Sequence, residues 1–90
     1  MTRDEQMFWN MQLQSEFVKY LIEHPEFDAQ IPDGAHIVFM PDNDPELREE
    51  NTKLIEQVRR EGNKVVIVRV KGLMPDRSRL IEPTIEPIPA

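Results

Sequence analysis

The sequence predicts a two-layer α/β protein, in which a long N-terminal helix precedes a right-handed βαβ unit with a small, mostly parallel sheet. An extended, proline-rich tail follows. Two observations carry this prediction: two short runs of strand-forming residues flank a helical segment, and four of the eight prolines lie after residue 71. We expect one domain over residues 1–90, with its core at 1–71 and its tail at 72–90.

Residues 4–23 are expected to form the first helix, with Thr2 or Asp4 as its N-cap. Spacings of three and four align one apolar stripe, which consists of Trp9, Leu13, Phe17, Tyr20 and Leu21. Further apolar side chains widen this stripe beyond what a small sheet would cover. We therefore expect an interaction surface on this helix, formed by Phe8, Trp9, Met11, Val18 and Ile22.

The helix should end at His24, because a residue that precedes proline is disfavoured in helical conformation. A short helical turn at 26–30 and a Pro32-Asp33-Gly34 turn are expected next. Residues 35–40 are apolar without alternation, which is typical of a strand covered on both faces. We expect Pro41 to end this strand.

A second helix is expected from Pro45 to about Glu61, capped by Asp44 and stopped by Gly62. Its apolar stripe is expected to contain Leu47, Asn51, Leu54, Ile55 and Val58. Residues 64–71 should form a strand parallel to the first, with Val66, Val68 and Val70 on one face. Two strands make a marginal sheet, so a third must come from the tail, from the segment before Ile31 or from another copy.

The tail is too apolar for a free linker and too rich in proline for a central strand. We expect it to be extended, at best an edge strand, and to lie on its own subunit or on a neighbouring one. The surplus apolar surface and the incomplete sheet together predict a homodimer or higher oligomer.

Positive charge is concentrated in one segment of an acidic chain. Residues 59–79 carry seven basic and two acidic side chains, whereas the whole chain has a net charge of −6. We expect a candidate anion site formed by Arg69, Lys71, Arg77 and Arg79. Neutralisation of neighbouring acidic residues is the plainer interpretation. Nucleic-acid binding is disfavoured because all six aromatic residues precede residue 40.

A candidate metal pair, Asp42 and Asp44, follows the first strand. The plainer interpretation is a turn and a helix cap, which require the same residue types. The chain has no cysteine, and His24 and His36 have no ligand spacing. We therefore expect no cofactor and no catalytic residue.

The N-terminal sequence lacks the apolar run of a signal peptide, so we expect a cytoplasmic protein without a membrane partner. The leading hypothesis is a non-enzymatic structural or interaction protein that self-associates or binds another protein. A small regulator or enzyme that binds anions or nucleotides through the arginine cluster is the alternative. Weak nucleic-acid binding through that cluster is the third hypothesis.

Three motifs suggest a family: Glu23-His24-Pro25-Glu26-Phe27, then Asp44-Pro45-Glu46-Leu47, then Val65–Val70 followed by Pro75-x-Arg77-Ser78-Arg79-Leu80. Together they resemble a small prokaryotic family of uncharacterised proteins, a domain of unknown function, over nearly the whole chain. The resemblance implies no activity, and no catalytic residue follows from it.

Overall fold

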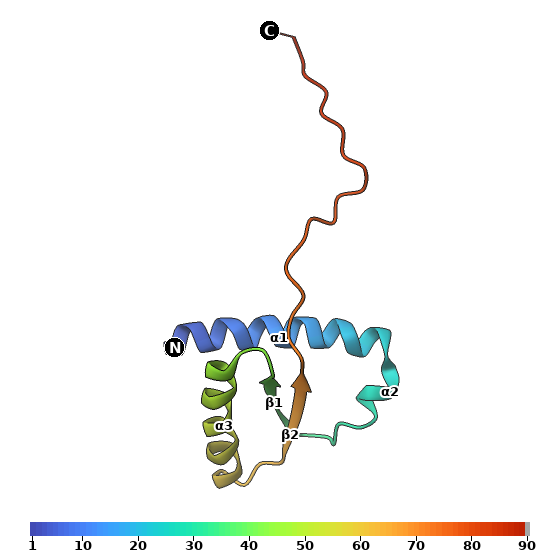
Figure 1. Ribbon diagram of the computed structural model, residues 1–90. Coiled ribbons are helices and arrows are strands. Elements are labelled where there is room, and N and C mark those ends of the chain that lie inside the picture. Colours follow the sequence, from blue (N-terminus) through green and yellow to red (C-terminus); the bar gives the residue numbers. More distant parts are fainter. Residues whose placement is uncertain (90) are drawn as a thin grey trace.

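Two helices, a strand, a helix and a second strand follow one another along the chain (Figure 1). The computed structural model describes residues 1–89, so Ala90 of the expected tail lies outside the described residues. The elements are α1 (Arg3–Glu23), α2 (Pro25–Asp28), β1 (His36–Pro41), α3 (Pro45–Arg60) and β2 (Val65–Val70). This arrangement confirms the predicted α/β fold.

Local signals set the helix ends. The Thr2 hydroxyl accepts a hydrogen bond from the Glu5 amide at 3.1 Å, and the Glu5 carboxylate accepts one from the Thr2 amide at 3.3 Å. This capping box makes Thr2, not Asp4, the N-cap of α1. The Asp44 carboxylate accepts from the Leu47 amide at 3.1 Å and starts α3. Gly62 follows the end of α3 with φ 80°, a conformation that other residues rarely adopt.

The two strands are parallel, with His36 opposite Val65 and Pro41 opposite Val70. Pro41 is thus the last residue of β1, not the residue that stops it, because its missing N–H lies on the side away from β2. The middle and end of β1 are buried, as its uninterrupted apolar run predicts. On β2 the even-numbered valines are partly buried while Ile67 and Arg69 are exposed, which confirms the predicted faces.

The core forms where α1, α3 and the sheet meet. Leu13, Phe39 and Leu47 are its buried centre, and Val68 and Val70 pack against them. A further apolar contact joins α1 to β1, where the rings of Phe17 and Phe39 meet edge to face at 5.7 Å. One small cluster therefore connects all three elements.

The apolar stripe expected on α1 is partly wrong. Trp9 and Tyr20 are each 43% exposed, although the pattern placed both toward the core. The inward side of the helix is instead formed by Gln6, Asn10, Leu13, Phe17 and Leu21. Two amides belong to that side because a buried amide on α3, Asn51, is their partner.

The tail adds no strand. Leu73 packs against the core, but every residue described from Met74 onward is exposed. Figure 1 shows the tail running away from the body in the direction in which β2 points, and the described chain extends over 66 × 34 × 21 Å. Within residues 1–89 the sheet has two strands, so neither the tail nor the segment before Ile31 supplies the expected third.

Candidate interaction surface

The outward face of α1 carries an apolar row, broken at its centre by Gln14 and Ser15, with no covering element in the described chain. Met7, Met11, Val18 and Ile22 are 54%, 65%, 50% and 76% exposed. A helix turns by about 100° per residue, so spacings of four, seven and four keep these side chains on one side. That side lies opposite Leu13, which is buried. We call these four residues the outer row.

A groove extends the outer row toward α3. It has a volume of about 340 Å³ and includes Met7 and Met11 of α1 together with Leu54 of α3. The remaining lining is polar: Arg3, Gln6, Asn10 and Gln14. An apolar centre with a polar rim is typical of a protein contact, and methionine side chains adapt readily to a partner.

All five residues expected on the interaction surface are exposed. Phe8 and Trp9, which complete that set, are 53% and 43% exposed and meet edge to face at 5.1 Å. Met7 was not in the predicted set, although its spacing of four from Met11 and of eleven from Val18 is a signal for it. The role of this surface in binding stays a prediction.

The far end of α1 is closed by aromatic contacts. The His24 ring stacks on Tyr20 at 4.1 Å, and Phe27 of α2 meets Tyr20 edge to face at 5.3 Å. The His24 Nδ1 atom lies 3.2 Å from the Tyr20 carbonyl. His24 thus fixes the turn between the helices, whereas His36 is exposed at the start of β1.

The two predicted metal ligands have other partners. Asp44 caps α3, and an Asp42 carboxylate oxygen lies 3.4 Å from Arg69 Nη1. Among the residues described, no group of three His, Asp or Glu side chains is placed to hold a metal ion. The observed contacts are those of the plainer interpretation, a turn with a helix cap.

The predicted anion site is not assembled in this conformation. Arg69 pairs with Asp42, so its charge is partly neutralised. Lys71 is exposed just after β2, while Arg77 and Arg79 lie in the extended tail. A site for one anion needs convergent donors, and the tail carries two of the four away from the sheet.

A buried amide cluster is the feature that sequence reasoning missed. Asn51 is 1% exposed, and its Nδ2 donates to the Asn10 Oδ1 and the Phe39 carbonyl, each at 2.8 Å. Its Oδ1 accepts from Asn10 Nδ2 at 2.9 Å and Gln6 Nε2 at 3.1 Å. Both donors and both acceptor positions of this amide are therefore used. The cluster fastens α1 and α3 to β1, and the only sequence signal for it was an asparagine within an apolar stripe.

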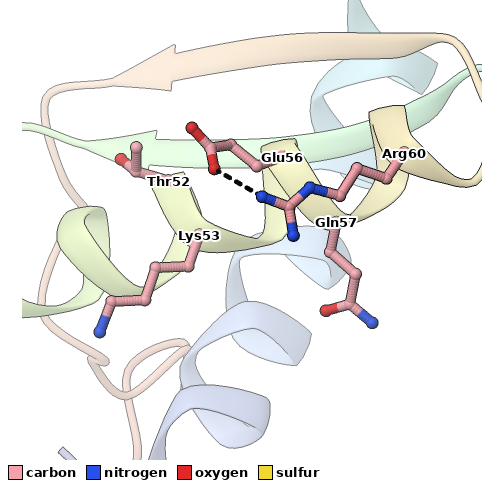
Figure 2. A pocket seen from close by; sticks show the side chains of 5 residues that line it. All are labelled: Thr52, Lys53, Glu56, Gln57 and Arg60. Atoms are coloured by element: carbon pink, nitrogen blue, oxygen red, sulfur yellow. Dashed lines mark ion pairs between the residues drawn. The ribbon is translucent and has the colours of Figure 1, made fainter.

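A second hollow lies on the solvent side of α3 (Figure 2). It has a volume of about 520 Å³, and all of its lining belongs to one helix: Thr52, Lys53, Glu56, Gln57 and Arg60. Glu56 and Arg60 form an exposed ion pair at 3.7 Å. Such i,i+4 pairs stabilise a helix by about 0.3–0.5 kcal/mol, so these charges have a local structural role.

No helix in the described part of the chain combines the length and the apolar character needed to cross a membrane. Searches among curated proteins and among solved structures found no match to the chain. A family model does match, over residues 6–83, which is most of the sequence and includes every helix and strand named above apart from the first turn of α1. This match confirms the predicted resemblance to an uncharacterised domain. The chain belongs to the Family of unknown function (DUF5647).

Proposed function

We propose that this protein is a non-enzymatic interaction protein that forms a homodimer through the outer row of α1. The observation that carries the proposal is the exposure of four aligned apolar side chains, each at least half accessible, on a helix whose opposite side already packs on the core. Clustered exposed apolar side chains of this kind mark protein contacts in soluble proteins. A cytoplasmic location and a prokaryotic origin stay predictions.

A second copy of the chain fits this surface by symmetry. The 21 residues of α1 span about 31 Å, which is long enough for two helices to pack along their whole length. In an antiparallel pair related by a twofold axis, Met7 and Met11 of each helix would face Val18 and Ile22 of the other. The spacing of four, seven and four supplies one knob for nearly every turn of the contact.

Light scattering coupled to size-exclusion chromatography tests the proposal. We expect the native chain to elute at twice its mass of 10.6 kDa. Val18→Lys together with Ile22→Lys should shift it to the monomer, because two charges would be buried in an apolar contact. Gln12→Lys is the matched control, since Gln12 is exposed on another side of the same helix and should leave the dimer intact. A native chain that stays monomeric at high concentration, or a double variant that stays dimeric, would contradict the proposal.

A further inference from the structure

The outer edge of β2 is open for strand pairing. The His36 amide donates to the Lys64 carbonyl and the Asp42 amide to the Val70 carbonyl, each at 2.8 Å. Even-numbered residues of both strands therefore direct their backbone groups into the sheet, since alternate residues of a strand point to the same side. On β2 the amides and carbonyls of Val65, Ile67 and Arg69 point outward, and within residues 1–89 no strand lies beside them.

The tail has one edge with a full set of N–H donors that could pair with this open edge of β2, because its prolines all lie at odd-numbered positions. Pro83, Pro87 and Pro89 are all odd-numbered, so one edge of an extended tail would lack three of its five N–H donors and keep only those of Ile81 and Ile85. The other edge keeps every donor, from Glu82, Thr84, Glu86 and Ile88. Such a strand can join a sheet on one side only, and it then terminates the sheet.

The side chains of the tail alternate with the same two-residue period as its N–H donors. Apolar and polar residues alternate from Ile81 to Pro87, so an extended tail has one apolar face of Ile81, Pro83, Ile85 and Pro87. Glu82, Thr84 and Glu86 form the opposite face. The polar face therefore belongs to the residues whose N–H groups are available for pairing.

We propose that residues 81–86 from a second copy of the chain pair with the outer edge of β2 as an antiparallel strand. The inference deepens the proposed function and rests on its self-association, because each copy would receive the tail of the other. The exchange would extend the sheet from two strands to three in each subunit and cover the open edge. The tail would then be a third strand, as its sequence pattern favours, although it does not form one in its own subunit.

Only the antiparallel orientation directs the N–H donors of the tail toward β2 and also places its apolar side chains on the core face. In an antiparallel pair, the residues that exchange hydrogen bonds lie directly opposite each other and share a face. The donor-bearing even residues of the tail would then stand beside Ile67 and Arg69 on the exposed face, and the apolar odd residues beside Val66 and Val68 on the core face. A parallel strand would reverse this and place Glu82 and Glu86 on the core face.

Charge and length suggest the register. With Glu82 opposite Arg69, Thr84 lies opposite Ile67 and Glu86 opposite Val65, next to Lys64. Arg69 is exposed and has one weak ion pair at 3.4 Å, so it can also form an ion pair with a second carboxylate. In this register Ile81, Pro83 and Ile85 lie opposite Val70, Val68 and Val66, so the six residues from Ile81 to Glu86 match all six residues of β2.

The course of the tail favours a second copy over its own subunit. Leu73 is held on the core, and Gly72 lies so close to the Asn43 side chain that a Cβ at this position would displace that side chain. From this anchor the chain continues in the direction of β2 and leaves the body (Figure 1). Glu82 has φ 42° in the detached tail, an unfavourable conformation for a residue that precedes proline. Pairing would return it to an extended conformation.

The parity of the prolines supplies a sharp test. Thr84→Pro together with Glu86→Pro removes two donors from the pairing edge, whereas the control Ile85→Pro removes one from the opposite edge, which already lacks the donors of Pro83, Pro87 and Pro89. In the native chain we expect the Ile67 and Arg69 amides to exchange with deuterium roughly tenfold or more slowly than in the double variant, measured by NMR. Ile85→Pro should retain most of this protection. Fast exchange of both amides in the native chain, or equal loss in both variants, would overturn the proposal.

Cysteine cross-linking identifies the copy that supplies the tail. The chain has no cysteine, so Ile67→Cys in one chain and Thr84→Cys in another introduce one reactive thiol each. Opposite residues of an antiparallel pair have Cα atoms about 4.5–5.5 Å apart, which suits a disulfide. Oxidation of the mixture should give a product of two chains that contains one of each variant. In the doubly substituted chain, an internal disulfide at the mass of one chain would instead assign the tail to its own subunit and overturn the exchange.

The α1 double-lysine variant separates the two proposals. If it becomes monomeric and also loses protection at Ile67, both contacts belong to one dimer and both proposals are supported. If it stays dimeric and protected, the tail exchange is supported and the outer row is not the contact. If the native chain is dimeric through α1 but Ile67 is unprotected, the proposed function is supported and the tail exchange is overturned.

Discussion

At the outer edge of β1, the Phe39 carbonyl accepts a hydrogen bond from Asn51, and Pro41 has no N–H that would need a partner. At the outer edge of β2, three residues direct amides and carbonyls outward, and no strand lies beside them within residues 1–89. The first edge is covered by α3 and held by the amide cluster. The described tail leaves the body instead of pairing with the second edge. The comparison separates an edge whose backbone groups have partners within the subunit from an edge that the proposed tail exchange would cover.

The same division applies to the two sides of α1. Its inner side packs Leu13 into the core and joins Gln6 and Asn10 to Asn51. Its outer side presents the apolar row to solvent. Substitutions at the outer edge of β1 or on the inner side of α1 should therefore change the free energy of unfolding. Substitutions at the outer edge of β2 or on the outer side of α1 should change the association of two copies.

Leu47→Ala should have the largest effect on folding. Leu47 is 2% exposed at the centre of the core, and truncation of such a leucine costs about 2–5 kcal/mol. Urea denaturation of the two proteins measures the difference in the free energy of unfolding. Leu47→Met, which keeps the volume, should cost less than about 1.5 kcal/mol. A loss below about 1 kcal/mol for the alanine variant would show that this side is not the stable one.

Asn51→Ala should come next. It leaves the Phe39 carbonyl and two amides without their buried partner, which should lower the free energy of unfolding by about 2–3 kcal/mol. Gln57→Ala, an exposed position on the same helix, is the control and should change it by less than about 0.5 kcal/mol. Equal effects of the two substitutions in chemical denaturation would mean that the amide cluster contributes nothing measurable.

Asp44→Ala should lower the free energy of unfolding by about 1 kcal/mol, because the Leu47 amide loses its acceptor at the start of α3. It also tests the role of Asp44 as a cap. Circular dichroism during thermal unfolding gives the measurement, with exposed Glu49→Ala for comparison. A stabilised Asp44→Ala protein that no longer binds an added divalent ion would favour the metal interpretation.

Ile67→Thr should change the free energy of unfolding by less than about 0.5 kcal/mol in protein dilute enough to be monomeric. Ile67 is half exposed on β2, so its truncation leaves no cavity. Val68→Thr places a hydroxyl against the core and should be clearly more destabilising. If Ile67→Thr is as destabilising as Val68→Thr in the monomer, the β2 side is already covered by the subunit's own chain.

The smallest effect expected is a pH dependence on the β1 side. The ion pair of the Met1 amine with Glu46 raises the pKa of that amine above its ordinary value near 8. A raised pKa in the folded state means that the stabilisation is complete below about pH 8 and is lost as the pH rises through the folded value. The difference in unfolding free energy between the native chain and Glu46→Gln should therefore shrink from pH 7 to pH 10. A difference that stays constant would show that the pair contributes nothing.

Much of the fold could be predicted from short-range signals. Asp44, Pro45 and Gly62 mark the ends of α3, and the two β-branched runs mark the strands. The parallel pairing follows because a helix connects the strands. These features depend on residues close together in the sequence, so the chain specifies them locally.

The site was less predictable. All five residues expected on the interaction surface are exposed, but Trp9 was also expected in the packed stripe. Counting apolar residues cannot show that Gln6 and Asn10 face inward, because their partner lies more than 40 residues away. The same limit applies to Arg69. The charge of its segment predicted that it would lie with other basic residues, whereas in the fold it lies beside Asp42.

The amino-acid sequence by itself determined the Asp44 cap of α3, the strand faces and the proline parity of the tail, because each depends on backbone geometry within a few residues. Only the tertiary structure decided that Asn51 is buried with a complete set of partners, and that β1 rather than β2 is the covered edge. Those outcomes depend on which surfaces meet when distant segments pack. A polar side chain can be buried when all of its hydrogen bonds are satisfied, and a hydropathy pattern does not contain that information.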